Sequence, residues 1–315
     1  MKKAIIPFIL LCLLLATACG NGSNNNGSPG STDAQPDAQP EASGSSTITY
    51  QSENGPVEVP AHPERVVVLS TFAGNVMALD VNLVGVDSWS KMNPRFEEKL
   101  KDVQEVSDEN LEKIIELQPD LIIGLSTIKN VDKLKQIAPT VTFTYGKVDY
   151  LTQHIEIGKL LNKEKEAQDW VDDFKKRTQQ AGEEIQAKIG KDATVSVLEK
   201  FDKQLYVFGD NWGRGTEILY QAMHLNMPDK VKEMALKDGY YAVSLEVMSE
   251  FAGDYVILSK NSDADNSFQN TDTYKNIPAV KNNRLFEVNA KEFYFNDPLT
   301  LDFQLDFFRK SFLGQ

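Results

Sequence analysis

The chain has 315 residues, of which 41% are hydrophobic, and a formal net charge of −13 at pH 7. This length is enough for one large or two medium hydrophobic cores. A surface this acidic argues against nucleic-acid binding, which needs a basic footprint, and against general electrostatic capture of anionic ligands.

The first residues are typical of a signal peptide. Lys2 and Lys3 precede a short apolar run, and small residues and Cys19 follow it. The run is shorter than the about 20 residues that span a membrane. We expect removal of residues 1–18 and lipidation of Cys19, as in bacterial lipoproteins. Because Cys12 leaves with the signal, the mature chain can form no internal disulfide and no thiolate metal site.

A flexible tether is predicted after the lipidated cysteine, so that residues 19–46 form the anchor and tether. Its composition is Gly, Ser, Asn, Pro, Asp and Gln, which cannot build a core. Order is predicted to begin near Thr47 with a hairpin over 48–59 around Asn54 and Gly55.

Strands and helices then alternate in both halves, which indicates largely parallel sheets. In the first half the predicted strands are 65–70, 84–86, 120–125 and 140–144, and the helices end at 79, 117, 137 and 161. A long helix over 163–189 places apolar residues on one stripe. In the second half the predicted strands are 193–198, 203–208, 254–259 and 284–288, and the helices are 216–224, 244–251, 272–281 and 298–312.

One phrase occurs twice. Residues 112–123 are echoed by residues 246–257, with acids at the same four-residue spacing before an apolar run. Each copy is predicted to be a helix that enters a buried strand. The fold class is therefore α/β, with two similar lobes (47–162 and 190–315), the long helix as a stiff link, and a ligand cleft between the lobes. Only modest lobe movement is expected.

Two segments carry the candidate ligand contacts. Trp212 and Arg214 lie among glycines just after a strand, where an exposed aromatic ring and a guanidinium fork could hold a ligand. The alternative is a Trp212 packed in the core beside a surface arginine. The aromatic cluster 293–298 also follows a strand and is expected to face the same cleft. The full set of candidate ligand-binding residues is Phe72, Tyr145, Tyr206, Trp212, Arg214, Phe293 and Tyr294.

Metal and hydrolase sites are poorly supported. The three histidines, His62, His154 and His224, lie in unrelated contexts, and no Gly-x-Ser-x-Gly motif is present. Asp210 and Asp297 fit turn or helix-cap positions better than an acid/base pair.

These motifs resemble the siderophore-binding lipoproteins of Gram-positive iron-uptake ABC transporters, in particular their ferric-hydroxamate (FhuD-type) group. The resemblance rests on the lipobox, the duplicated acidic phrase, the long linking helix, and the sequences GDNWGRG and FYFNDP, and it covers residues 47–315. It implies the class III periplasmic-binding-protein fold, an extracellular, lipid-anchored monomer, and no catalysis. Leu125 departs from relatives that can carry an aromatic residue there.

The same resemblance assigns roles to individual residues. Trp212 and Arg214 would contact a siderophore of the ferrichrome or ferrioxamine type, which wraps the ferric iron, so that the protein binds no cofactor or metal itself. Glu112 and Glu246 would dock on arginines of the permease. Their matched register also predicts equivalent positions on one rim of the cleft.

Charge favours the hydroxamate class independently. A ferric trishydroxamate is close to neutral, whereas a ferric triscatecholate carries three negative charges and would need several basic groups to offset its desolvation. Haem, with Tyr294, Tyr145 or His224 as axial ligand, and cobalamin remain alternatives. An extracellular lipoprotein hydrolase is the alternative from another class.

Overall fold

The computed structural model describes residues 46–314, and the expected signal peptide, lipidated cysteine and nearly all of the tether lie outside them. The described chain opens with the expected hairpin, in which β1 (Thr47–Ser52) pairs antiparallel with β2 (Gly55–Pro60). Gly55 follows the turn with φ of 104°, a conformation that favours glycine. Within the described residues, none of the helices is both long and apolar enough to cross a membrane.

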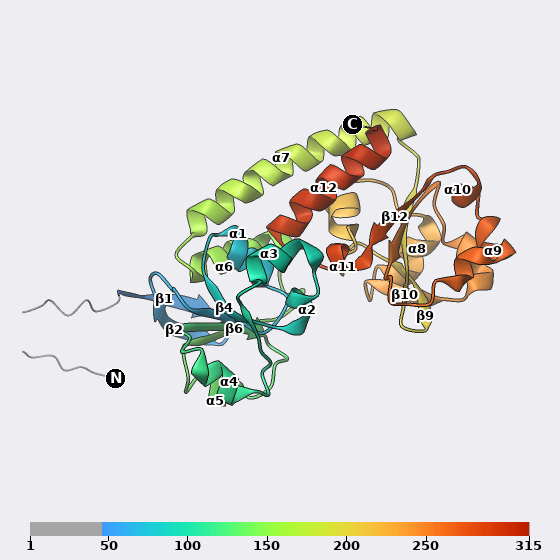
Figure 1. Ribbon diagram of the computed structural model, residues 1–315. Coiled ribbons are helices and arrows are strands. Elements are labelled where there is room, and N and C mark those ends of the chain that lie inside the picture. The colour runs from blue at the N-terminus through green and yellow to red at the C-terminus, as the bar shows by residue number, and fades with distance from the viewer. Residues whose placement is uncertain (1–45, 315) are drawn as a thin grey trace, which may run out of the picture. The chain divides into compact units, whose positions relative to one another are not determined.

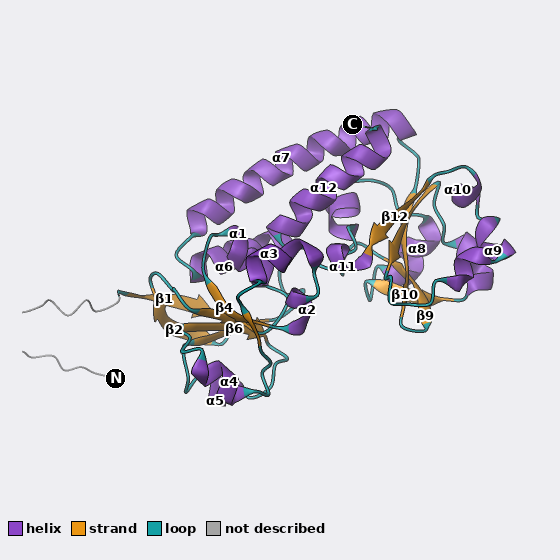
Figure 2. Cartoon of the chain, viewed as in Figure 1, coloured by secondary structure: helices purple, strands orange, loops and turns teal. Residues whose placement is uncertain are grey.

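The N-terminal lobe is built on an all-parallel, five-stranded sheet of order β5-β4-β3-β6-β7. Its strands are β3 (Val66–Val68), β4 (Leu83–Val86), β5 (Gln104–Glu105), β6 (Leu121–Leu125) and β7 (Thr140–Phe143). Its helices are α1 (Ala73–Ala78), α2 (Ser88–Lys91), η1 (Pro94–Phe96), α3 (Glu97–Leu100), α4 (Leu111–Glu116), α5 (Val131–Leu134) and α6 (Tyr150–Leu160). Figure 2 shows these helices around the strands.

The C-terminal lobe has a mixed sheet of order β10-β9-β8-β11-β12, in which β9 and β10 run antiparallel to their neighbours. Its strands are β8 (Val195–Phe201), β9 (Gln204–Phe208), β10 (Tyr240–Val243), β11 (Tyr255–Lys260) and β12 (Leu285–Asn289). Its shorter helices are η2 (Glu217–Ala222), α8 (Asp229–Ala235), η3 (Leu245–Glu250), η4 (Ser267–Asn270), α9 (Asp272–Lys275), α10 (Pro278–Lys281) and α11 (Ala290–Phe293).

The repeated phrase occupies equivalent places in the two lobes. Each copy leads into the strand beside the central one, β6 next to β3 and β11 next to β8. The last acid of each copy fastens the segment that enters the central strand. Asp120 accepts a hydrogen bond from the backbone N–H of Arg65 at 3.0 Å, and Asp254 accepts one from that of Thr194 at 2.9 Å. The predicted architecture of two similar α/β lobes is confirmed.

Two helices, rather than the one expected, tie the lobes together. α7 (Glu164–Ile189) and α12 (Pro298–Leu313) lie side by side (Figure 1). α7 contributes Ala167 to the core of the N-terminal lobe and Phe174 to that of the C-terminal lobe. The segment before α12 inserts Phe295 into the N-terminal core, where its ring packs on Phe96. Two such connections strengthen the expectation of small lobe movements.

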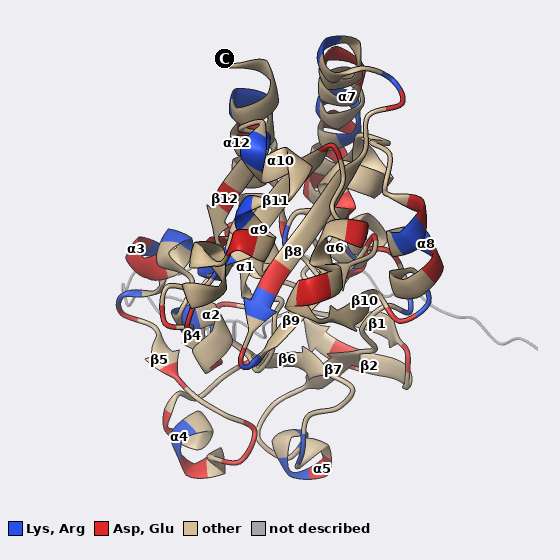
Figure 3. Cartoon of the chain, turned by 90° about the vertical axis from the view of Figure 1, so that its right-hand side faces the viewer, with Lys and Arg blue, Asp and Glu red and all other residues tan. Residues whose placement is uncertain are grey.

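Some expected elements have a different form. The second copy of the repeated phrase, η3, is a 3₁₀ helix and not an α-helix, so its acids at four-residue spacing do not stack as they would on an α-helix. The segment expected as helix 216–224 is a π-helix. The helix expected over 272–281 is interrupted, because Pro278 cannot continue it and instead begins α10. Figure 3 shows acidic and basic residues mixed along α7 and α8, while most strand positions are uncharged.

Candidate ligand-binding site

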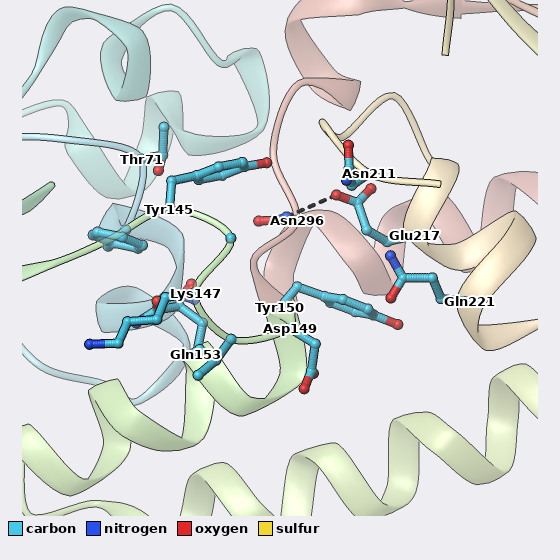
Figure 4. A pocket seen from close by; sticks show the side chains of 14 residues that line it. Thr71, Tyr145, Lys147, Asp149, Tyr150, Gln153, Asn211, Glu217, Gln221 and Asn296 are labelled. Carbon is cyan, nitrogen blue, oxygen red and sulfur yellow. Dashed lines mark hydrogen bonds between the residues drawn. The ribbon is translucent and has the colours of Figure 1, made fainter. Parts of the chain in front are cut away.

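A pocket of about 260 Å³ lies where the two lobes meet. The N-terminal lobe lines it with residues of the loops after β3 and β7 and of α6, and the C-terminal lobe with the loop after β9, η2 and the segment before α12. Its lining side chains include Phe72, Tyr145, Tyr150, Gln153, Asn211, Glu217, Gln221 and Asn296 (Figure 4). Because the carboxyl ends of strands from both sheets meet there, this is the expected place for a ligand in an α/β fold.

A row of aromatic rings borders the pocket and crosses from one lobe to the other. The ring of Tyr145 lies 5.2 Å from that of Trp212, which lies 5.8 Å from that of Tyr240. The ring centre of Tyr240 in turn lies 5.8 Å from that of Tyr206. Trp212 is 42% exposed and Tyr145 40%, so that the expectation of an exposed Trp212 is confirmed and its burial in the core is excluded. We call these four residues the aromatic row.

The loop that carries Trp212 has an unusual backbone. Trp212, Gly213, Arg214 and Gly215 have successive φ angles of 79°, 69°, 59° and 84°. Left-handed backbone is rare for a tryptophan or an arginine and persists only where the surroundings enforce it. The middle of the loop is also closely packed, since a Cβ on Gly213 would lie 2.3 Å from the carbonyl oxygen of Tyr294.

Hydrogen bonds fasten this loop to the second predicted segment. The backbone N–H of Arg214 donates to the carbonyl of Phe293 at 2.5 Å. The N–H of Gly213 and the side-chain amide of Asn296 both donate to Oε1 of Glu217, each at 3.0 Å. The two motifs that the sequence singled out, 205–215 and 293–298, are therefore bonded to each other.

Arg214 is not the exposed fork that the sequence suggested. Its side chain is only 13% exposed, and its Nε donates to Oε2 of the fully buried Glu199 at 2.6 Å. Its Nη1 donates to the carbonyl of Trp212 at 2.8 Å. The guanidinium carbon lies 4.5 Å from the ring centre of Tyr294 and 4.7 Å from that of Phe208. Arg214 is thus held in one position, with part of its donor set already used.

The remaining predicted ligand residues divide into two groups. Tyr294 faces the cleft: its hydroxyl donates to Oε1 of Glu199 at 2.9 Å, and its ring meets Trp89 of the N-terminal lobe at 5.5 Å. Burial, and then the adjacent Glu199, raise the pKa of Tyr294. Phe72 lines the pocket but is 5% exposed. Phe293 is 1% exposed and packs on Phe308, so it belongs to the core and offers a ligand no surface; that expectation was wrong.

Several residues of the site were not found from the sequence. Glu199 is an inward-facing acid on β8, and Tyr240 lies on the edge strand β10, which was not predicted. Trp89 lies in α2, which begins shortly after the parallel strand β4 ends at Val86, and that position was the one available signal, since ligands gather at the carboxyl ends of such strands. Trp89 is 45% exposed.

The two acids expected to dock on a permease lie apart from the pocket. Glu112 is exposed in the first turn of α4, and Glu246 is exposed in the first turn of η3. The positions two residues later, Ile114 and Met248, are both fully buried and anchor the two helices alike. A hydrogen bond from Ser244 lowers the pKa of Glu246.

Of the three alternative axial haem ligands, Tyr145 lines the pocket, whereas Tyr294 is already hydrogen-bonded and His224 is not among the lining residues. The hydroxyl of Tyr294 is bound to Glu199, and His224 is exposed beyond η2, where its carbonyl accepts a hydrogen bond from Gln186 of α7. His154 is buried beside Trp170, and burial lowers its pKa to about 4. Among residues 46–314, no group of three or more His, Cys, Asp or Glu side chains is arranged to hold a metal ion. Asp297 caps α12, as the sequence indicated.

Known proteins resemble this chain along most of its length. A family model described as periplasmic binding protein matches residues 66–292. The iron(3+)-hydroxamate-binding protein FhuD of Bacillus subtilis (strain 168) is 35% identical over 318 aligned positions, which cover 98% of each chain. FhuD from S. pseudintermedius has a TM-score of 0.77 at 39% identity and covers 86% of this chain and 99% of its own. FhuD2 from Staphylococcus aureus with bound ferrioxamine B has a TM-score of 0.76 at 36% identity, with 80% and 99% covered.

Proposed function

The chain belongs to the periplasmic binding protein family, and we propose that it captures ferric hydroxamate siderophores and delivers them to an ABC permease for iron import. The ligand would be of the ferrichrome or ferrioxamine type and would keep all of the iron's coordination sites to itself. The protein would supply contact surface and hydrogen bonds, bind no cofactor, and carry out no reaction on the ligand.

The observation that carries this proposal is the aromatic row with Arg214 beside it. A ferric trishydroxamate is a compact, nearly neutral complex with an apolar outline and exposed carbonyl oxygens. Tyr145 and Trp212 offer half-exposed rings from both lobes to such an outline. Arg214, held next to them, retains donors on its Nη atoms for ligand oxygens. The relative that was solved with ferrioxamine B supports the same ligand class.

The cellular part of the proposal rests on the N-terminal sequence and on the acids of the repeated phrase. A lipid on Cys19 and the tether up to residue 46 would hold the protein on the outer face of the cell membrane as a monomer. Glu112 and Glu246, exposed at equivalent places in the two lobes, would meet basic groups on the two permease subunits.

Tryptophan fluorescence tests the ligand class directly. Trp89 and Trp212 lie at the cleft, whereas Trp170 lies on α7, where its indole donates to Asp302. We expect saturable quenching by ferrichrome and ferrioxamine B, and none by a ferric triscatecholate. The Trp170→Phe variant should retain most of the quenching, and a Trp89→Phe/Trp212→Phe double variant should lose it. Saturable quenching by haem or cobalamin without any response to the two hydroxamates would contradict the proposal.

A further inference from the structure

The positive charge of Arg214 is compensated inside the protein. Glu199 has no exposed surface, and its two oxygens accept hydrogen bonds from Nε of Arg214 and from the hydroxyl of Tyr294. Both contacts are from donors, as an ionised carboxylate requires. At 2.6 Å and largely out of water, the two charges form a tight pair whose outward field is that of a dipole rather than of a cation.

Two lysines near the cleft do not replace this charge. Lys147 is the basic residue that lines the pocket, and its Nζ lies 3.2 Å from Oε2 of Glu53. Lys200 follows Glu199 on β8, and its Nζ lies 3.3 Å from Oδ2 of Asp265. The positive charge of each lysine is thus offset by the neighbouring carboxylate.

The floor of the cleft carries a further acid. Glu217 is 2% exposed and accepts hydrogen bonds from Gly213, Thr216 and Asn296, all of them neutral donors. Within the part of the chain that the structure describes, it forms no ion pair. The formal charges of Arg214, Glu199 and Glu217 therefore sum to −1, in spite of the arginine.

We propose that Glu199 sets the charge selectivity of the site: by pairing with Arg214 it lets the arginine act as a hydrogen-bond donor while denying anionic complexes a net positive partner. The inference rests on the proposed function. It adds Glu199 as a residue that determines which ligand charges the site accepts. Neutral and cationic ferric hydroxamates bind, and anionic ones are disfavoured, because a buried charge without a compensating partner is costly.

A ligand series with one iron-binding core tests this rule. Ferrioxamine B carries a pendant ammonium, its N-acetyl derivative is neutral, and its N-succinyl derivative ends in a carboxylate. Wild-type protein should bind the N-succinyl derivative no more tightly than ferrioxamine B; an uncompensated Arg214 would reverse that order. In Glu199→Gln, whose amide can still accept from Arg214 and donate to Tyr294, the preference should shift toward the N-succinyl derivative by about tenfold.

The matched control is Glu184→Gln. Glu184 also pairs with an arginine, Arg309 at 2.9 Å, but between α7 and α12 and away from the pocket. This variant should show the wild-type order of the three ligands. Circular dichroism and melting temperature establish that each variant is folded. If wild-type protein binds the anionic derivative more tightly than the cationic one, or if the ratio in Glu199→Gln equals that in wild type, the charge rule is wrong. Failure of wild-type protein to bind even the neutral derivative would instead overturn the proposed function.

Discussion

Tyr145 and Trp212 belong to different lobes, and their ring centres lie 5.2 Å apart at an interplanar angle of 38°. Tyr145 follows β7 of the N-terminal sheet, and Trp212 follows β9 of the C-terminal sheet. The aromatic row is therefore a product of the assembled fold: neither lobe alone presents it. A ligand that rests on this row touches both lobes at once, so its affinity depends on their relative position.

Replacing either ring should weaken ligand binding without unfolding the protein. Trp212→Ala and Tyr145→Ala should each reduce the affinity for ferrioxamine B by about 1–3 kcal/mol, the range for one lost aromatic contact and its buried area. Because both side chains are about 40% exposed, the melting temperature should change little. Isothermal titration and thermal unfolding measure the two effects. A large fall in melting temperature with unchanged affinity would show that the rings serve packing alone.

The pairing of the two ligand segments explains which parts of the site a sequence can reveal. Glycines and aromatic residues marked 205–215 and 293–298 individually, because tight turns and exposed rings have local signatures. Nothing local indicated that Arg214 would be tied to Glu199. On β8 an acid looks like an ordinary strand position, and only the antiparallel pairing of β8 with β9 brings the following loop back over it.

The limits of the fold prediction have a similar origin. The long helix α7 was predicted because its apolar stripe repeats over many turns. The two lobes were predicted because the same phrase occurs in both halves of the chain. The second connection, in which Phe295 enters the N-terminal core ahead of α12, depends on tertiary contacts between segments 199 positions apart. Short elements such as α2 and β10 have too few residues for a periodic pattern to register.

Removal of Arg214 should reduce stability as well as affinity. Arg214→Ala leaves Glu199 buried without its cation, and breaking a buried pair in this way costs about 3–5 kcal/mol. The variant should therefore unfold at lower denaturant concentration and bind ferrichrome more weakly. A double variant, Arg214→Ala/Glu199→Ala, should regain part of the stability but none of the affinity. Equal stability of wild type and Arg214→Ala would contradict the buried pair.

The contact between α1 and the start of α12 should tolerate no added methyl group. A Cβ on Gly74 would lie 2.1 Å from Cγ and Oδ1 of Asp297, which caps α12. Gly74→Ala should lower the free energy of unfolding by about 1–3 kcal/mol, the cost of overpacking a closed site. The shorter cap in Gly74→Ala/Asp297→Ser should restore part of the loss. Ala78→Ser, on the less buried end of the same helix, is the control; urea unfolding that places Gly74→Ala at the wild-type midpoint would refute the contact.

Asp297 should make stability depend on pH between about 4 and 6. Burial raises the pKa of this carboxyl from 3.8 to about 6, against the hydrogen bonds from Thr300 and Leu299. A folded-state pKa above the unfolded one favours folding below pH 4, and that advantage is lost as the pH rises through 6, by about 3 kcal/mol in all. Asp297→Asn still caps the helix and has no charge to bury. Its stability relative to wild type should rise between pH 4 and pH 7.

A second helix cap provides a control of opposite sign. Asp149 caps α6; although burial alone would raise its pKa, hydrogen bonds from Thr152 and Leu151 lower the pKa overall. Asp149 therefore stabilises the fold at neutral pH, and its contribution disappears as the pH falls. Relative to wild type, Asp149→Asn should lose stability as the pH rises, where Asp297→Asn gains. Parallel pH profiles for wild type and Asp297→Asn would rule out the raised pKa.

Glu112 and Glu246 should be needed for transport and dispensable for ligand binding. Both are exposed in the first turn of the equivalent helices α4 and η3, away from the pocket, and a permease with two like subunits would present paired basic sites to them. Exposed complementary charges chiefly set encounter rate and orientation. Glu112→Lys/Glu246→Lys should therefore abolish uptake of iron-labelled ferrichrome by cells, while the purified variant binds ferrichrome within about twofold of wild type, since the reversed charges are screened at this distance. Asp172→Lys/Glu183→Lys, which makes the same charge change on the exposed face of α7, should transport normally. Normal uptake by the first pair would reduce these acids to solvated surface residues, and loss of uptake by both pairs would point to net charge rather than docking.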